Sequence, residues 1–169
     1  ALRLCPDDRD ALLIAADVEE HRGDVSAALD VLDRLADADD AQIRCSVHVR
    51  RGRLFRSRMD DLEGARIEFE AAHEALPSDL DAALALLDLL EFEQDWVAAQ
   101  VVAERAAELQ SDGRGRAELW AHAGRIAHQH LADEPRALGC FERALVEDPV
   151  DLQTQAMIGR IYWERQDAQ

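Results

Sequence analysis

Three histidines, His122, His128 and His130, come nearest to a metal-binding cluster in this sequence. A helix turns by about 100° per residue, so His128 and His130 would lie about 120° and about 80° from His122 around the axis. Imidazoles that point in such different directions do not converge on one tetrahedral ion. The sequence therefore predicts no metal site and no cofactor.

The candidate nucleophiles have no activating partner at a suggestive spacing. None of the five serines has a general base at such a spacing; they are Ser26, Ser46, Ser57, Ser78 and Ser111. Motifs for phosphate loops, dinucleotides, zinc proteases and serine hydrolases are absent, and Gly113-Arg114-Gly115-Arg116 is expected to form a charged loop rather than a phosphate cradle. We therefore predict that the chain is not an enzyme.

The cysteines also argue against a redox or zinc role. Cys5, Cys45 and Cys140 are far apart, odd in number and without a C-x-x-C spacing. They are expected to be small buried hydrophobic residues in a reducing compartment, which predicts a cytoplasmic location.

Charge and composition exclude further classes of protein. The 169 residues include 36 acidic and 19 basic side chains, all the basic ones are Arg, and the formal net charge is −17. Nucleic acid would be repelled by this field, and no apolar run approaches the roughly 18 residues of a membrane span. An apolar content of 48% gives material for a core. The abundance of Ala and Arg, without Lys or Asn, points to a genome rich in G and C.

Residues recur with a period of 71 or 72 positions. Asp17, Asp24 and Ala28 return 71 residues later as Asp88, Asp95 and Ala99, and Gly52 and Phe69 return 72 residues later as Gly124 and Phe141. The extra residue must fall between Ala36 and Arg44 or in the counterpart from Leu109 to Arg116, which are expected to be loops, because an insertion in a helix would rotate every later side chain. The chain is therefore a repeat array.

Each long unit reads as two helical hairpins. Apolar residues at three- and four-residue spacing predict helices over residues 10–21 and 25–36, separated by Gly23-Asp24. The same helix pair is expected over residues 47–76, 81–109 and 117–147. No segment has the alternation of a strand, so the predicted fold class is all-α.

The pattern resembles the tetratricopeptide repeat family over essentially the whole chain. The residues of its consensus are Trp120, Ala123, Gly124, Ala127, Ala137, Phe141, Ala144 and Pro149, with further matches at Ala65, Phe69, Ala72, Pro77, Ile158, Gly159 and Tyr162. In the first repeat Asp40 replaces the terminating proline. The resemblance implies a right-handed α-solenoid of antiparallel hairpins, cut from a longer bacterial-type array, in which Trp96, Trp120 and Tyr162 belong to the core.

The register divides the chain into a single array. It places the tail of a preceding repeat at 1–6, repeats at 7–40, 41–78, 79–112 and 113–150, and the first helix of a further repeat at 151–169. An apolar face on this last helix would be left without a partner.

In the family, the first helix of each hairpin lines the concave face. Carrying those positions over gives a candidate partner-binding surface of Asp17, Glu20, Arg53, Arg56, Asp88, Phe92, Arg125, His128, Arg160 and Trp163. The signs alternate from repeat to repeat, which has two interpretations. Neighbouring repeats neutralise one another, each exposed pair contributing at most about 1 kcal/mol, or a polar groove selects a ligand, with Phe92 and Trp163 as anchors. The family's carboxylate clamp for acidic peptide tails uses Lys and Asn, which this chain lacks.

The expected function is a non-catalytic scaffold that binds another protein or peptide, without nucleic acid or membrane insertion. One alternative is a structural segment that stacks end to end, the last helix docking on Leu2 and Leu4 of another copy. Another is the regulatory arm of a larger signalling enzyme. The remaining acidic side chains, on second helices and loops, are expected to form a solvated surface.

Overall fold

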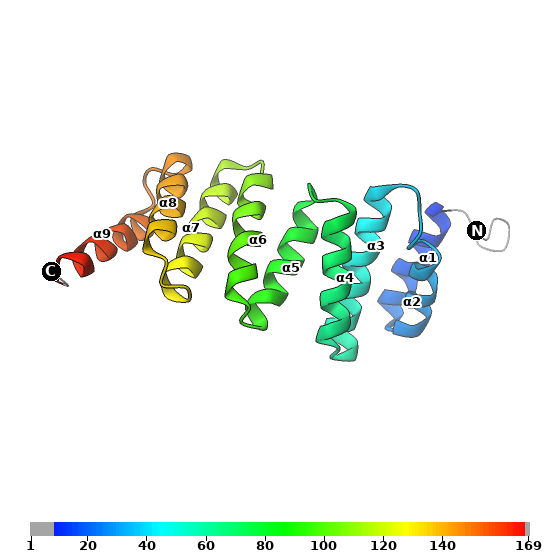
Figure 1. Ribbon diagram of the computed structural model, residues 1–169. Helices are drawn as coiled ribbons and strands as arrows, with labels where there is room; N and C mark the ends of the chain where they lie inside the picture. The colour runs from blue at the N-terminus through cyan, green and yellow to red at the C-terminus, as the bar shows by residue number, and fades with distance from the viewer. Residues whose placement is uncertain (1–8, 168–169) are drawn as a thin grey trace. The chain divides into compact units, whose positions relative to one another are not determined.

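The computed structural model describes residues 9–167, and these residues form helices joined by short turns, with no strand among them (Figure 1). The first helices of the expected hairpins are α1 (Arg9–Arg22), α3 (Ala41–Leu54), α5 (Leu80–Phe92), α7 (Gly113–Gln129) and α9 (Leu152–Asp167). The second helices are α2 (Val25–Asp33), α4 (Leu62–Ala75), α6 (Trp96–Leu109) and α8 (Glu134–Glu147). A π-helical turn, η1 (Phe55–Met59), continues α3.

The chain forms two compact units that meet within α5, one ending at Leu86 and the other beginning at Leu87. In the N-terminal unit, α1 packs on α2, and α3 packs on α4. In the C-terminal unit, α7 packs on both α6 and α8, and α8 packs on α9. The all-α helical-repeat class predicted from the sequence is therefore confirmed, while the exact repeat boundaries stay a prediction.

A close approach between a glycine and a phenylalanine recurs in both units. A Cβ atom placed on Gly52 of α3 would lie 2.5 Å from Cε1 of Phe69 on α4, and one on Gly124 of α7 would lie 2.5 Å from Cε1 of Phe141 on α8. Both rings are fully buried. The two helices of each hairpin therefore approach so closely that the aromatic ring occupies the space of a missing side chain.

The core of each unit is built from the apolar stripes that the sequence pattern predicts. In the N-terminal unit, Leu12, Leu32 and Val47 join α1, α2 and α3 in one buried cluster. In the C-terminal unit, Phe141 and Ile161 pack together where α9 meets α8. Small residues such as Ala16, Ala65 and Ala137 are fully buried at the helix contacts, which permits this tight packing.

An aspartate stands before every helix from α2 to α9 and accepts a hydrogen bond from a backbone N–H of the first turn. The eight are Asp24, Asp40, Asp61, Asp79, Asp95, Asp112, Asp133 and Asp151. Each satisfies a donor that has no partner within the helix, and its charge also favours the positive end of the helix dipole. Many of the acidic residues are therefore structural caps. The role of Asp40 at the usual proline position is now clear, because it caps α3.

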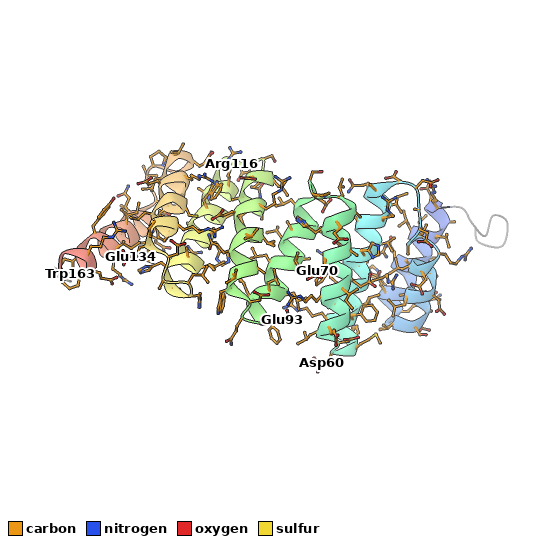
Figure 2. All side chains as sticks on the ribbon, viewed as in Figure 1. Asp60, Glu70, Glu93, Arg116, Glu134 and Trp163 are labelled. Atoms are coloured by element: carbon orange, nitrogen blue, oxygen red, sulfur yellow. The ribbon has the colours of Figure 1, made fainter. Side chains whose placement is uncertain are left out.

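The turns inside the hairpins also share a residue with a positive φ angle. Gly23, Asp60, Gln94 and Ala132 adopt positive φ angles of 77°, 54°, 61° and 51°, and each directly precedes the capping aspartate. Asp60 marks the turn between η1 and α4 in Figure 2. The left-handed residue stops the first helix and the aspartate starts the second, which explains why these turns are short.

Some local predictions were wrong. The segment Gly113–Arg116 is the first turn of α7 rather than a loop, because Asp112 accepts a hydrogen bond from the Gly115 N–H and so starts the helix early. For the same reason α3 begins at Ala41, capped by Asp40, and not at Val47. The helix expected to reach Ala36 ends at Asp33 and continues as turns.

The three aromatic residues assigned to the core differ in how far the structure buries them. Trp120 is buried, as predicted, and Arg143 stacks on its ring. Trp96 is half-buried and stacks on the His130 ring. Tyr162 is 48% exposed, so its assignment to the core was wrong; it lies on a face of α9 that the described chain does not cover.

No helix of the described residues has the length and apolar character that a membrane crossing requires.

We predict that Gly124→Ala destabilises the protein. The added methyl group would clash with the Phe141 ring, and overpacking of this kind costs about 1–3 kcal/mol. The better helix propensity of Ala returns only about 0.5–1 kcal/mol. Thermal unfolding followed by circular dichroism should show a lower Tm.

Gly159→Ala is the matched control, because Gly159 lies in α9 with no atom within 4 Å of the added Cβ. This variant should gain the helix propensity without a clash and have an equal or higher Tm. If Gly124→Ala raised the Tm as much as Gly159→Ala, the close-approach argument would be wrong.

Candidate functional site

The N-terminal unit has two adjoining recesses on the side of its first helices. The α1–α3 recess is lined by Glu20, His21, Arg50, Arg53, Leu54, Ser57 and Arg58. The α3–α5 recess is lined by Gln42, Cys45, Ser46, Val49, Arg50, Arg53, Asp79 and Asp81. Arg50 and Arg53 belong to both recesses, so two guanidinium groups on α3 separate them.

Arg50 is the centre of a charge cluster between α1 and α3. Its Nη2 lies 2.7 Å from Oδ1 of Asp17, and its Nε donates to Oε1 of Glu20 at 2.8 Å. Asp17 and Glu20 were predicted site residues, and the structure brings them together on Arg50. Sequence reasoning missed Arg50, although it lies one turn before Arg53 and so on the same helix face.

Arg53 pairs with the next first helix. Its Nη2 lies 2.6 Å from Oδ1 of Asp81, and both side chains are more than half exposed. An exposed pair of this kind contributes at most about 1 kcal/mol. Within the N-terminal unit, the charges of neighbouring first helices therefore neutralise one another, as one of the two interpretations of the alternating signs expected.

The C-terminal unit has a recess between α7 and α9. It is lined by Arg114, Ala117, Glu118, Ala121, Arg125, Asp148, Asp151 and Gln153, and its volume is about 450 Å³. Thr154 donates a hydrogen bond to Asp151. That bond has the largest effect on the pKa of Asp151, which lies below its usual value, and the nearby Arg125 charge lowers it further.

His122 connects α5 with Arg125. Its Nε2 makes a hydrogen bond with Glu91, and its Nδ1 lies 3.3 Å from Nη2 of Arg125. Arg125 has only donors, so Nδ1 must accept and the ring proton of neutral His122 is assigned to Nε2, which donates to Glu91. The imidazole therefore links the Glu91 carboxylate to the Arg125 guanidinium by hydrogen bonds.

The other predicted site residues lie on several elements. Arg56 is half-buried in η1, and Asp88 and Phe92 are exposed on α5, Phe92 to 63%. His128 is half-buried on α7, whereas Arg160 and Trp163 are exposed on α9, where Figure 2 labels Trp163. The predicted residues therefore fall into a group in each unit, described separately.

The three candidate metal ligands have different surroundings. His122 contacts Glu91, His130 stacks on Trp96 with ring centroids 3.6 Å apart, and His128 makes neither contact. Among residues 9–167, no group of three His, Cys, Asp or Glu side chains is placed to hold a metal ion. Two serines line the recesses, Ser46 and Ser57, and the Ser57 hydroxyl donates to the Arg53 carbonyl.

Two buried polar networks lie on the side of the second helices. Glu68 is only 7% exposed and lies 2.8 Å from Nδ1 of His48 and 2.9 Å from Nη2 of Arg51. Arg51 also lies 3.1 Å from Asp33, so the network joins α2, α3 and α4. The expectation that the acidic side chains of the second helices form a solvated surface was wrong for Glu68.

The second network surrounds Glu104 in the C-terminal unit. Its Oε1 accepts hydrogen bonds from Gln100 at 2.8 Å and from Arg136 at 2.7 Å. Burial alone would raise the pKa of Glu104, but the hydrogen bonds from Arg136 and Gln100 outweigh it, so the pKa lies below its ordinary value. The ionised Glu104 of α6 therefore holds α8 through its ion pair with Arg136.

The two cysteines within the described residues are free and buried, as the sequence predicted, whereas Cys5 lies outside those residues. Burial, reinforced by the charge of Asp79, raises the pKa of the Cys45 thiol to about 11. Burial and the charge of Glu104 raise the pKa of the Cys140 thiol to about 12. Both thiols are thus poor nucleophiles at neutral pH.

We predict that a Cys5→Ser variant resists alkylation by iodoacetamide at pH 8. With a pKa of about 11, roughly one Cys45 thiol in a thousand is ionised at that pH. Mass spectrometry should find both remaining cysteines unmodified in the folded protein and modified in urea. Asp79→Asn, which retains an acceptor for the helix cap, should lower the pKa of Cys45. Rapid alkylation of the folded protein at pH 8 would contradict this assignment.

Comparison with known proteins finds similarity in structure but not in sequence. No protein-family model and no curated protein sequence matches the chain. The crystal structure of MamA aligns over 93% of this chain and 82% of its own, with a TM-score of 0.64 and 15% identity. The N-terminal domain of stress-induced protein-1 from C. elegans aligns over 74% of this chain and 99% of its own, with a TM-score of 0.61 and 18% identity.

YrrB, described as a TPR protein with an unusual peptide-binding site, aligns over 92% of this chain and 77% of its own, with a TM-score of 0.55 and 17% identity. At such low identity the likeness concerns the arrangement of helices. It agrees with the paired helices of each unit. The chain has the tetratricopeptide-repeat fold.

Proposed function

We propose that this chain is a non-catalytic interaction scaffold that binds a partner protein or peptide on the side of its first helices. The observation that carries the proposal is the recurrence of polar recesses on this side in both units, each with arginine and aspartate side chains in its lining. The interior beneath the recesses is apolar and tightly packed. The recesses are therefore features of the protein surface, and their linings are similar in the two units.

The proposed binding residues are those expected from the sequence, together with Arg50. Exposed Phe92 and Trp163 provide apolar area beside the charged groups, and aromatic and arginine side chains dominate the energetics of protein interfaces. The peptide-binding site named for YrrB is in line with this assignment. The free, buried thiols of Cys45 and Cys140 support the cytoplasmic location expected from the sequence.

We predict that replacing Arg53, Arg125 and Arg160 together by Glu abolishes partner capture. The wild-type chain serves as bait for affinity capture from the source organism, and mass spectrometry identifies the bound protein. The variant then presents carboxylates where the partner meets guanidinium groups, and like charges at an interface oppose association. Circular dichroism must confirm an unchanged helix content.

The matched control is Arg34, Arg66 and Arg105, replaced together by Glu. Arg66 and Arg105 lie on second helices and Arg34 follows α2, and the triple variant has the same change of net charge. Capture should survive in the control. Equal capture by both variants would refute binding on the side of the first helices.

Self-association is a second candidate, favoured by the exposed face of α9. Tyr162 is 48% and Trp163 is 63% exposed, and contiguous exposed aromatic residues mark interaction surfaces. The proposed contact residues on the other copy, Leu2 and Leu4, lie outside the described residues. Under this candidate, sedimentation at rising concentration detects a growing oligomer that Trp163→Ala weakens. A monomer at all concentrations well above micromolar would eliminate it.

A further inference from the structure

The α3–α5 and α7–α9 recesses are two copies of one site, related by the repeat. Each lining residue of the first has a counterpart 72 positions later in the second, except that His122, the counterpart of Arg50, lies beside the second recess. Arg53 corresponds to Arg125, and the helix cap Asp79 corresponds to Asp151. The differences between the copies therefore indicate what each recess can hold.

The decisive difference lies at the second residue of the next first helix. In the α3–α5 recess this residue is Asp81, whose carboxylate lies 2.6 Å from Nη2 of Arg53. In the α7–α9 recess the equivalent residue is Gln153, which has the same place in the lining but no charge. The carboxylate that pairs with Arg53 in the first recess thus has no counterpart at this position of the second, although Glu118, Asp148 and Asp151 also line that recess.

Arg125 is left with unused hydrogen-bond donors. A guanidinium group has five N–H donors, and the bond of Arg125 to His122 at 3.3 Å uses one of them. Among the described side chains, which end at Arg165, no carboxylate forms an ion pair with Arg125, although the charge of Arg125 acts on nearby Asp151. Arg125 is half-buried, so its charge is partly removed from water and a carboxylate ligand would be favourable there.

The carboxylates around this recess already have donors of their own. Glu118 lies 3.2 Å from Nε of Arg114, Asp151 accepts from the Gln153 N–H at 3.0 Å, and Asp148 accepts from the Val150 N–H at 3.2 Å. Of the two arginines in the lining, Arg114 is thus paired with Glu118, which leaves Arg125 as the one without an ion pair among the described side chains. The α7–α9 recess also has smaller side chains in its lining, because Ala121 replaces Val49 and Ala117 replaces Cys45.

We propose that the α7–α9 recess binds a carboxylate group of the partner, which takes beside Arg125 the place that Asp81 takes beside Arg53. This inference rests on the proposed scaffold function and specifies its ligand chemistry. It differs from a clamp of Lys and Asn side chains, since a single arginine provides the charge. The carboxylate comes from an Asp or Glu side chain or from a chain terminus, and the probes below distinguish these sources.

The test uses the full chain labelled with ¹⁵N and follows the arginine Nε–H signals by NMR. The Arg125→Gln spectrum identifies the Arg125 signal. Three capped probes are titrated: Ac-Gly-Glu-Gly-NH₂ with a side-chain carboxylate, Ac-Gly-Gly-Gly-OH with a terminal one, and neutral Ac-Gly-Gln-Gly-NH₂. We expect a saturable shift of the Arg125 signal with at least one of the two acidic probes and none with the neutral probe.

Reciprocal exchange of the two residues gives the decisive variants. Gln153→Asp supplies an internal carboxylate and should weaken probe binding at least about tenfold, which corresponds to about 1.4 kcal/mol. Asp81→Gln should open the α3–α5 recess and produce a new saturable shift of the Arg53 signal. Gln155→Asp adds the same charge to α9 at a position outside the recess lining, and should change binding by no more than about twofold.

An Arg125 signal that no acidic probe moves would overturn the inference, as would a Gln153→Asp variant that binds as well as the wild type. If Asp81→Gln gives no new Arg53 shift, the equivalence of the recesses is wrong. These failures are distinguishable from failure of the scaffold proposal, because partner capture and its loss in the triple Glu variant are measured independently.

Discussion

The contact between a helix glycine and the ring of a phenylalanine is the constraint on which the rest of each unit depends. Gly52 with Phe69, and Gly124 with Phe141, bring the two helices of a hairpin so close that no side chain fits between them. This spacing fixes which face of the first helix is buried. The arginine that follows each glycine, Arg53 or Arg125, lies about 100° further around the helix and is thereby directed to the recesses. A repeat of 72 residues preserves the contact and with it the position of the arginine.

The charge of −17 has a structural part and a functional part. Eight aspartates cap the helices α2 to α9, and each cap typically contributes about 1 kcal/mol. Other carboxylates are used in cross-helix ties, such as Glu68 with His48 and Arg51. Eight of the 36 acidic side chains therefore serve to start the helices α2 to α9, and several others tie helices together.

The sequence was sufficient for the features that repeat, because periodic apolar and small residues determine helix pairing. It predicted the hairpins, the recurrence of Phe69 as Phe141, and the burial of Cys45 and Cys140. It did not locate the starts of α3 and α7, where a single capping hydrogen bond extends the helix. Nor did it identify Arg50, because which of two arginines one turn apart meets Asp17 depends on the rotation of α3 against α1.

The two units also show how one framework gives unequal binding surfaces. Arg50 with Asp17 and Glu20 corresponds to His122 with Glu91, and Asp81 corresponds to Gln153. Both changes reduce internal charge pairing in the C-terminal unit. Hydrogen-bond donors that are not used in internal pairs are available to a partner. The α7–α9 recess therefore has more capacity to bind a partner group than the α3–α5 recess.

A negative protein with a receptive arginine selects for partners on two length scales. At physiological ionic strength charges are screened beyond about 8 Å, so the net charge of −17 attracts basic surfaces and repels acidic ones only over the last part of their approach, and the charges that line a recess act at contact. At contact, Arg125 favours a carboxylate, while the surrounding Glu118, Asp148 and Asp151 disfavour a dense acidic tract. A partner that satisfies both conditions carries a single carboxylate among neutral or basic residues. Under the proposed scaffold function, that pattern accounts for recognition of an acidic group without attraction of acidic proteins in general.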